Sequence, residues 1–340
     1  MARRSTIQDL AATAGVSVST IDRILNGRSA VRPATADRVL AAAEEIGFYA
    51  LPALRQRLQA RHPGTRIGVL LQQSHRTFYR MIAKALRQAA TETAEPVELI
   101  VEHMDDLSPE AVADRMLRLG AEVDAITVVS AEHPRIASAI DQLAARGVPT
   151  YGLISELTAT TATGYVGLDN WRVGRTAAWA AASLCQRPGR VGILVGNHRY
   201  RCQELNESGF RSYLREHAPH LTLLEPVQTF EDNAIARDVT EQLLHREPEL
   251  VALYVAGGGM PGALEALRAS GRTTSLVTLG NDLTEHTRLG LIDHVLAMVF
   301  AHPIQRLATE TIAHVQRELA SGAGPTKRLL AFDIYGPENL

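Results

Sequence analysis

Apolar positions recur at helical spacing in three short segments at the start of the chain, residues 6–14, 18–26 and 33–46. Each segment is followed by a glycine, Gly15, Gly27 or Gly47, of the kind that ends a helix in a left-handed conformation. Pro33 stands at the start of the third segment, where proline is tolerated. The pattern predicts an all-α head of three helices, and the short turn between the first two makes them a helix-turn-helix.

From residue 65 onward, short apolar runs alternate with amphipathic segments, which predicts strands covered by helices. The predicted strands are 66–71, 96–101, 125–129, 149–154, 191–195, 221–224, 251–255, 274–279 and 328–335. The predicted helices are 79–93, 109–119, 134–146, 173–186, 204–216, 261–270 and 303–319. This alternation is typical of an α/β domain with parallel sheets, and its restart after residue 170 predicts two lobes.

Breaks in the pattern divide the chain into a head, a linker and an α/β domain, at residues 1–48, 49–63 and 64–340. The first lobe of the α/β domain is expected to comprise 64–166 and a returning segment, 297–340. The second lobe is expected to comprise 167–296.

Charge is distributed unevenly, although the net charge of the 340 residues is only −2. The first 61 residues hold nine arginines and five acidic residues, a net +4; the remainder holds 26 basic and 32 acidic residues, a net −6. A basic head on an acidic body indicates that the head binds a polyanion. Two cysteines, no signal-like apolar segment and no long apolar run favour a cytoplasmic protein without disulfides or membrane spans.

Side chains at the start of the second helix fit a DNA major groove. Val18 and Ser19 are short enough to allow close approach, and Arg23, one turn later, can reach guanine O6 and N7. Polar groups at helix starts and in the next loop are candidates for phosphate contacts: Ser5, Thr6, Ser17, Thr20, Asn26 and Arg28. The predicted partner is therefore double-stranded DNA, although each of these residues alone could be an ordinary solvated side chain.

Two stretches of the head, T-I-Q-D-L-A-A-T-A-G-V-S-V-S-T-I-D-R-I-L-N-G and V-R-P-A-T-A-D-R-V-L-A-A-A-E-E-I-G-F, carry a family resemblance. They resemble the head of the LacI/GalR family of bacterial repressors. The resemblance implies base contacts by Val18, Ser19 and Arg23. Asp22 departs from the family, which usually has a small hydroxyl residue there; an acid would repel phosphate or accept a hydrogen bond from cytosine.

The same resemblance implies that the linker forms a hinge helix, which orders on DNA and inserts a leucine into the minor groove. Leu54 and Leu58 both qualify, because the Pro-Asn pair usual in the family is displaced here. Arg55 and Arg57 suit the minor groove or its phosphates. The alternative is a flexible, solvated linker.

The α/β domain resembles the periplasmic-binding-protein-like effector domain of this family. Ligands of such folds bind beyond the carboxyl ends of the strands, here between the lobes. The candidate effector contacts are therefore Ser74, Phe78, Tyr79, Ser130, Glu132, Asp169, Asn170, His198, Arg199, Asn206, Asn281 and Asp282. At each position, a core aromatic or a solvated loop residue is an equal alternative.

The expected effector is a sugar, polyol or sugar acid. Many family members have an arginine where this chain has Asn206, whose amide has a shorter reach. Basic residues near the expected cleft could instead favour a sugar acid or a phosphate: His75, Arg76, His198, Arg199 and Arg201.

One motif points to an enzyme. Gly257, Gly259 and Gly262 after an apolar run, with Asp282 twenty residues on, match a dinucleotide-binding fingerprint, so an NAD-dependent oxidoreductase is the alternative function. Pro261 and the location deep within the α/β array argue against it. We therefore expect no enzymatic activity, no cofactor and no metal. A transport binding protein is disfavoured by the basic head.

The predicted mechanism is allosteric. Two heads of a homodimer would bind a pseudo-palindromic operator, and effector binding would change the order of the hinge helices. Repression is the expected outcome, but the pattern leaves open whether the effector induces or corepresses. The C-terminal residues show no leucine heptads, which favours a dimer over a tetramer.

Overall fold

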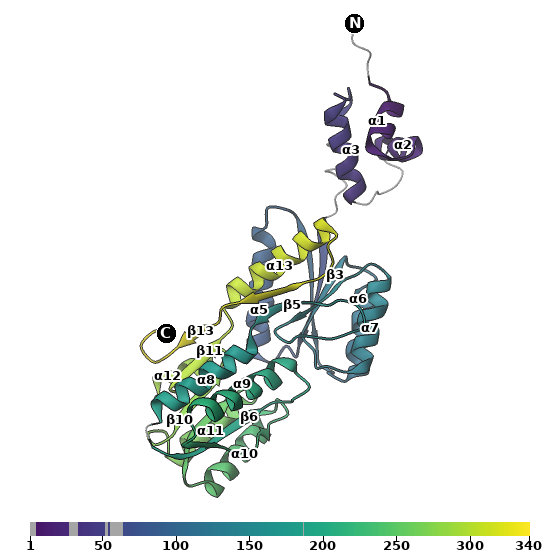
Figure 1. The fold of residues 1–340 in the computed structure, drawn as a ribbon. Helices are drawn as coiled ribbons and strands as arrows, with labels where there is room; N and C mark the ends of the chain where they lie inside the picture. Colours follow the sequence, from purple (N-terminus) through teal and green to yellow (C-terminus); the bar gives the residue numbers. More distant parts are fainter. Residues whose placement is uncertain (1–4, 27–32, 52–53, 55–63, 186) are drawn as a thin grey trace.

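The computed structural model describes residues 5–26, 33–51, 54, 64–185 and 187–340 (Figure 1). The predicted three-helix head is confirmed as α1 (Ile7–Ala14), α2 (Val18–Asn26) and α3 (Pro33–Glu45). Its core contains Leu10, Ile21 and Val39, each fully buried. Thr6 and Asp9 form a capping box at the start of α1, and Gly15 ends it in the left-handed conformation at φ 63°.

The first lobe is a six-stranded parallel sheet of order β12-β5-β4-β3-β1-β2. Its strands are β1 (Thr65–Gln72), β2 (Val97–Met104), β3 (Ala125–Val128), β4 (Thr150–Leu153), β5 (Gly164–Leu168) and β12 (Lys327–Leu330). Its helices are α5 (Thr77–Glu92), α6 (Pro109–Leu119), α7 (Pro134–Ala145) and α13 (Ile304–Ser321). Helix α5 packs against α13 and α6 packs against α7, so each pair covers one face of the sheet (Figure 1).

The second lobe is a seven-stranded sheet of order β13-β11-β10-β9-β6-β7, with β8 paired to β6. Its strands are β6 (Gly189–Val195), β7 (Leu221–Leu223), β8 (Val227–Gln228), β9 (Leu250–Val255), β10 (Val277–Asn281), β11 (Met298–Ala301) and β13 (Asp333–Tyr335). Its helices are α8 (Asn170–Leu184), α9 (Arg201–His217), α10 (Asn233–Arg246), α11 (Met260–Ser270) and α12 (Glu285–Ile292). All pairs are parallel except β11 with β13.

The chain crosses between the lobes at different points from those expected. Strand β11 pairs with β10, so the return to the first lobe comes at α13 rather than at residue 297. The expected terminal strand 328–335 is two strands: β12 completes the first sheet, and β13 goes back to the second. Two glycines weaken the apolar pattern of β5, and a largely polar sequence hides α10, which explains why neither element was predicted.

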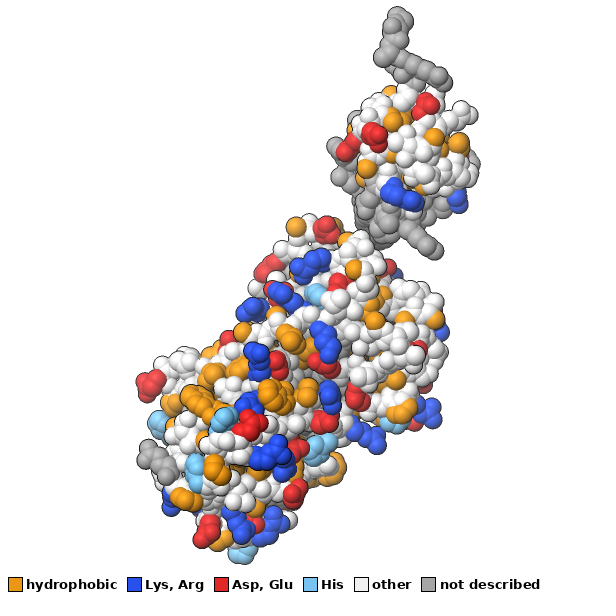
Figure 2. Space-filling model, viewed as in Figure 1, with side chains coloured by type: hydrophobic (Ala, Val, Ile, Leu, Met, Phe, Trp, Pro, Cys, Tyr) orange, Lys and Arg blue, Asp and Glu red, His pale blue; other side chains and the backbone are white. Residues whose placement is uncertain are grey.

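The surface of the two lobes carries basic and acidic side chains in mixture, as Figure 2 shows for one face. Hydrophobic side chains gather on that face over α8 and α9, where Trp171 and Trp179 are exposed. The guanidinium of Arg175 lies 4.8 Å from the centre of the Trp171 ring. Within the described parts of the chain, none of the helices is both long and apolar enough to cross a membrane.

Candidate functional site

The start and the exposed face of α2 carry five of the thirteen predicted DNA contacts: Ser17, Val18, Ser19, Thr20 and Arg23. Ser17, Val18, Ser19 and Arg23 are exposed, and 47% of the Val18 side chain is open to solvent. The hydroxyl of Ser17 lies 2.8 Å from those of Ser19 and Thr20. These hydroxyls bond to near neighbours at the surface. They can therefore exchange those hydrogen bonds for bonds to another molecule at a small cost in free energy.

Arg23 lies along the same helix, where its Nε donates to the carbonyl of Ser19 at 3.2 Å. Ser5 donates to the carbonyl of Gly47 at 3.3 Å, which ties the start of α1 to the end of the head. Thr6, in contrast, is committed to capping α1. Arg23 therefore places a positive charge on the exposed face of α2. Ser5 and Thr6 instead stabilise α1, which packs against α2 in the head.

The predicted hinge lies largely outside the described residues, as do Arg28, Arg55, Arg57, Leu58 and the side chain of Asn26. Leu54 is described, and it is fully buried in the core of the head. In this conformation Leu54 is a core residue, so it cannot reach a minor groove unless this end of the head unpacks.

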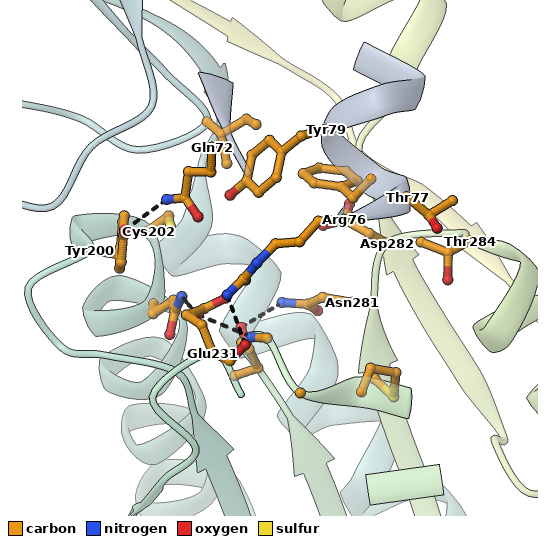
Figure 3. A pocket seen from close by; sticks show the side chains of 18 of the residues that line it. Gln72, Arg76, Thr77, Tyr79, Tyr200, Cys202, Glu231, Asn281, Asp282 and Thr284 are labelled. Atoms are coloured by element: carbon orange, nitrogen blue, oxygen red, sulfur yellow. Dashed lines mark hydrogen bonds and ion pairs between the residues drawn. The ribbon is translucent and has the colours of Figure 1, made fainter. Parts of the chain in front are cut away.

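A cavity of about 570 Å³ lies between the two lobes at the carboxyl ends of their strands (Figure 3). Six of the twelve expected effector contacts line it: Phe78, Tyr79, Asn170, Asn206, Asn281 and Asp282. The volume exceeds that of a monosaccharide, and polar and aromatic side chains both contribute to the wall.

The other six expected contacts do not line the cavity, and most have local partners. Asp169 caps α8, and Glu132 accepts a hydrogen bond from Thr158 at 2.8 Å. His198 lies between Glu207 and Gln228. The remaining three are Ser74, which is exposed, Ser130, whose hydroxyl donates to the next carbonyl, and Arg199, whose carbonyl accepts from the Glu132 N–H.

Arg76 and Glu231 form an ion pair across the cleft (Figure 3). Arg76 Nη1 lies 2.8 Å from Glu231 Oε2, and its Nη2 donates to the Glu231 carbonyl at 2.8 Å. The two side chains are only 20% and 13% exposed. Arg76 was noted in the sequence as one of several basic residues, but its partner was missed because β8, the strand before Glu231, is only two residues long.

The Glu231 carboxylate also contacts the second lobe. Its Oε1 accepts hydrogen bonds from Gln203 Nε2 at 2.6 Å and from the Gly258 N–H at 3.2 Å. A Cβ atom at Gly196 or Gly258 would lie within 2.0 Å of the carboxylate oxygens, so a side chain at either position would push the carboxylate out of this place. The three glycines of the fingerprint are explained without a dinucleotide. A Cβ at Gly257 would lie 2.3 Å from the Gly196 nitrogen, Gly259 has a φ of 92°, and a Cβ at Gly262 would lie 1.8 Å from the Asn233 carbonyl oxygen.

The backbone that carries Glu231 is in an unusual conformation. Phe230 and Glu231 both have positive φ, 50° and 63°. This left-handed region costs a residue with a side chain roughly 1–2 kcal/mol. Phe230 is also 61% exposed, so packing does not hold this turn in place. The contacts of the Glu231 carboxylate balance the strain together with a backbone hydrogen bond from the Phe230 N–H to the Gly196 carbonyl at 2.9 Å.

Further contacts join the lobes around the cavity. Gln72 Nε2, at the end of β1, donates to the Tyr200 hydroxyl at 2.7 Å, and the Cys202 N–H donates to Ser155 Oγ at 3.4 Å. Burial raises the pKa of the Cys202 thiol to about 12 and also raises the pKa of Tyr200. Both groups therefore stay neutral at physiological pH, where they can form hydrogen bonds but do not act as nucleophiles.

Among the described residues, three buried polar atoms on the cavity wall have no hydrogen-bond partner: Gln72 Oε1, Asn206 Oδ1 and His302 Nε2. His302 Nδ1 lies 2.7 Å from Asp282 Oδ1, which favours a proton on Nδ1 and leaves Nε2 as an acceptor. Buried polar atoms rarely remain unpaired in native proteins. The three acceptors therefore suit a ligand that donates several hydrogen bonds.

Family models match both parts of the chain. The model for bacterial regulatory proteins of the lacI family matches residues 6–50, and that for a periplasmic binding protein domain matches residues 67–322.

Relatives of this chain include named regulators. The HTH-type transcriptional regulator GalS of Salmonella typhimurium is 24% identical over 78% of this chain and 76% of its own. The regulator MalR of Streptomyces coelicolor is 23% identical over 82% of this chain and 72% of its own. The sucrose operon repressor of Escherichia coli is 38% identical, but over only 26% of this chain and 27% of its own.

Solved structures share the fold of the two lobes. A solute-binding protein from Agrobacterium vitis bound with alpha-D-tagatopyranose has a TM-score of 0.74 at 19% identity, over 81% of this chain and 95% of its own. A Burkholderia graminis solute-binding protein in complex with D-arabinose has the same TM-score at 18% identity, over 81% and 96% of the two chains.

Proposed function

Since this chain belongs to the LacI family of bacterial transcriptional regulators, which are not enzymes, we propose that it represses transcription from a specific operator under the control of a small ligand. The ligand is a sugar, polyol or sugar acid bound between the lobes, and the DNA is bound by a homodimer. The cleft carries the ligand part of this proposal, because three of the described side chains that line it hold a buried acceptor without a partner, next to aromatic side chains.

The head supports a role for α2 in reading the operator. Ser17, Val18 and Ser19 form an exposed, short-chained start of the helix, and Arg23 follows on the same exposed surface. In this role Val18, Ser19 and Arg23 meet base edges, while Ser17 and Thr20 lie near phosphates. A cytoplasmic location follows from DNA as the partner.

The cleft supports a polyhydroxylated ligand. Hydroxyl groups can donate to Gln72 Oε1, Asn206 Oδ1 and His302 Nε2, and the rings of Phe78 and Tyr79 give a sugar an apolar face to pack against. The two solute-binding proteins that share this fold hold sugars, alpha-D-tagatopyranose and D-arabinose, which agrees with this ligand class.

Ligand and DNA affinities are coupled in this proposal through the angle between the lobes. Contacts such as Gln72–Tyr200 and Arg76–Glu231 cross the cleft, so a ligand that rearranges them changes how the lobes meet. A dimer transmits that change to two heads and thus to both operator half-sites.

The proposal is tested by selecting duplexes from a randomised pool with the full-length protein. Enrichment of a palindromic sequence is expected, with affinity that falls steeply with salt. If no sequence is enriched, the regulator proposal is wrong. Arg23→Ala is expected to lower the affinity for the selected duplex about 10- to 100-fold, since a good base contact contributes about 1–3 kcal/mol.

The matched control is Arg38→Ala, which removes the same charge from the exposed side of α3 in the same head. It should weaken binding to all duplexes by a small, similar factor and leave the selected sequence unchanged. Equal losses in the two variants would contradict the role of Arg23 in base recognition.

A further inference from the structure

We propose that the effector is a polyhydroxylated carboxylate, a sugar acid, whose carboxylate displaces Glu231 from Arg76. Glu231 then serves as an internal anion that fills the carboxylate site when the effector is absent. This inference rests on the proposed function, because it names the ligand class of the same cleft.

The first half of the carboxylate site is Arg76, from the first lobe. Its guanidinium forms two 2.8 Å contacts with Glu231, one to the carboxylate and one to the carbonyl. A third contact, from Nε to Gln73 Oε1 at 3.0 Å, comes from its own lobe. Arg76 therefore remains aimed into the cleft when the Glu231 carboxylate leaves, and its Nη1 is then free to donate to an incoming carboxylate.

The second half of the site comes from the second lobe. Gln203 Nε2 and the Gly258 N–H both donate to Glu231 Oε1. Gln203 is itself held in place, because its Oε1 accepts from the N–H groups of Gly196 and Asn197 at 2.6 and 3.0 Å. The glycines leave room for a carboxylate and for little more, since a Cβ at Gly196 would lie 1.7 Å from Glu231 Oε1. Donors from both lobes thus surround one carboxylate group.

Glu231 is held by its carboxylate contacts and by the backbone of its turn, in which the Phe230 N–H donates to the Gly196 carbonyl at 2.9 Å. It and Phe230 form a left-handed turn at the end of the two-residue strand β8, and the Phe230 side chain is mostly in solvent. When an incoming carboxylate takes over the contacts of Glu231, the turn can relax and the Glu231 side chain can reach water. An ion pair whose carboxylate came from the middle of a helix or strand could not turn out to water in this way.

The rest of the cavity wall selects the hydroxylated part of the ligand. Gln72 Oε1, Asn206 Oδ1 and His302 Nε2 are acceptors, and Thr284 adds a hydroxyl (Figure 3). A neutral sugar satisfies these atoms but has no group that can replace a carboxylate on a largely buried arginine. A sugar acid provides both the hydroxyl groups for these acceptors and the carboxylate for Arg76.

The test is calorimetric titration of the full-length protein with matched ligand pairs that differ in the carboxylate. D-Gluconate is compared with D-glucitol, D-galactonate with D-galactitol, D-glucuronate with D-glucose, and D-galacturonate with D-galactose. We expect at least one acid to bind about tenfold or more tightly than its neutral partner, which corresponds to about 1.4 kcal/mol.

Substitutions of Glu231 and of Arg76 test the internal anion and its receptor separately. Glu231→Gln removes the competing charge, so it should tighten acid binding about tenfold and leave neutral ligands unchanged. Arg76→Gln should weaken acid binding about 100-fold, and Arg76→Lys should keep part of it. Glu216→Gln, which breaks the surface pair with Arg175, is the control. It should leave the affinities for acids and for neutral ligands unchanged.

The inference is overturned if neutral partners bind as tightly as the acids, if no acid binds the wild type or Glu231→Gln, or if Glu231→Gln leaves acid affinity unchanged. A thermal unfolding curve confirms that each variant is folded. Binding of neutral sugars only, together with a selected operator, would refute the sugar acid and leave the proposed regulator intact. Failure of the duplex selection would refute the regulator whichever ligand binds.

Discussion

The exposed face of α2 and the cleft between the lobes satisfy their polar groups in different ways. On α2, Ser17, Ser19 and Arg23 are exposed and bond to neighbours within four residues. In the cleft, Arg76 and Glu231 are largely buried, and their contact spans 155 positions of the chain.

This difference predicts two kinds of recognition. A surface of exposed, locally paired groups gains affinity from long-range attraction and can slide along many sequences before it finds the right one. A buried, interlocked set gains selectivity, because a ligand that leaves one partner unpaired bears the cost of a desolvated polar group. Four predictions test this comparison, in order of decreasing effect.

Salt should separate the two regions most strongly. Raising the salt concentration from about 50 to about 200 mM is expected to weaken operator binding roughly 10³-fold or more, because each phosphate contact releases counterions. Ligand affinity in the cleft should change less than about threefold, since buried charges are screened little. Fluorescence anisotropy for DNA and calorimetry for the ligand measure both. Similar salt dependence of the two affinities would break the comparison.

Gln203→Leu should reveal how much the buried network contributes to stability. The substitution removes the acceptor of the Gly196 and Asn197 N–H groups and a donor to Glu231. Since a buried unpaired group costs about 1–3 kcal/mol, the free energy of unfolding in urea should fall by about 2–4 kcal/mol. The control is Gln88→Leu, on the exposed side of α5, which should change it by less than about 0.5 kcal/mol. Equal effects would contradict the network.

Thr6→Ala should act on the head alone. It removes the side chain that accepts from the Asp9 N–H and so breaks the capping box of α1. The head should lose about 0.5–2 kcal/mol of stability, measured by hydrogen exchange of the α1 amides. Thr13→Ala, at the other end of the helix, is the control. Faster exchange throughout the α/β domain would show that the two regions are not independent.

Asp22→Ser should have the smallest effect. If α2 reads DNA as proposed, a carboxylate on it repels phosphates, so its removal should raise the affinity for random duplexes about two- to fivefold, on the order of 1 kcal/mol or less. The preferred base at one operator position should also change if Asp22 accepts from a cytosine. Unchanged affinity and preference would place Asp22 away from the DNA.

The head was predictable because each boundary has a local signal. Gly15 ends α1 in the left-handed conformation that its position after an apolar repeat suggested, and Pro33 opens α3. The alternation of apolar strands with amphipathic helices is also visible in the local sequence, and it predicted the parallel sheets. Crossings between the lobes have no such signal: nothing local distinguishes β12 from β13, although the two strands join different sheets.

The cleft was predictable in part. Strand-end positions identified Asn281 and Asp282, but Gln203 lies within a helix. His302 follows β11, a strand that the pattern did not reveal. The pairing of Arg76 with Glu231 depends on how two lobes meet. Conversely, Asp169 and His198 follow strands but bond to their own helix or a neighbour, so they do not line the cavity.

If ligand binding in the cleft controls DNA binding by the head, the affinities for ligand and operator must depend on each other. The affinity of the full-length protein for its selected operator should be measured with and without a saturating cleft ligand, and the ligand affinity with and without operator. We expect both affinities to change by the same factor, about 5- to 150-fold, and the acid to have no effect on DNA binding by Arg76→Gln. An operator affinity that is unchanged by a ligand bound in the cleft would contradict this expectation.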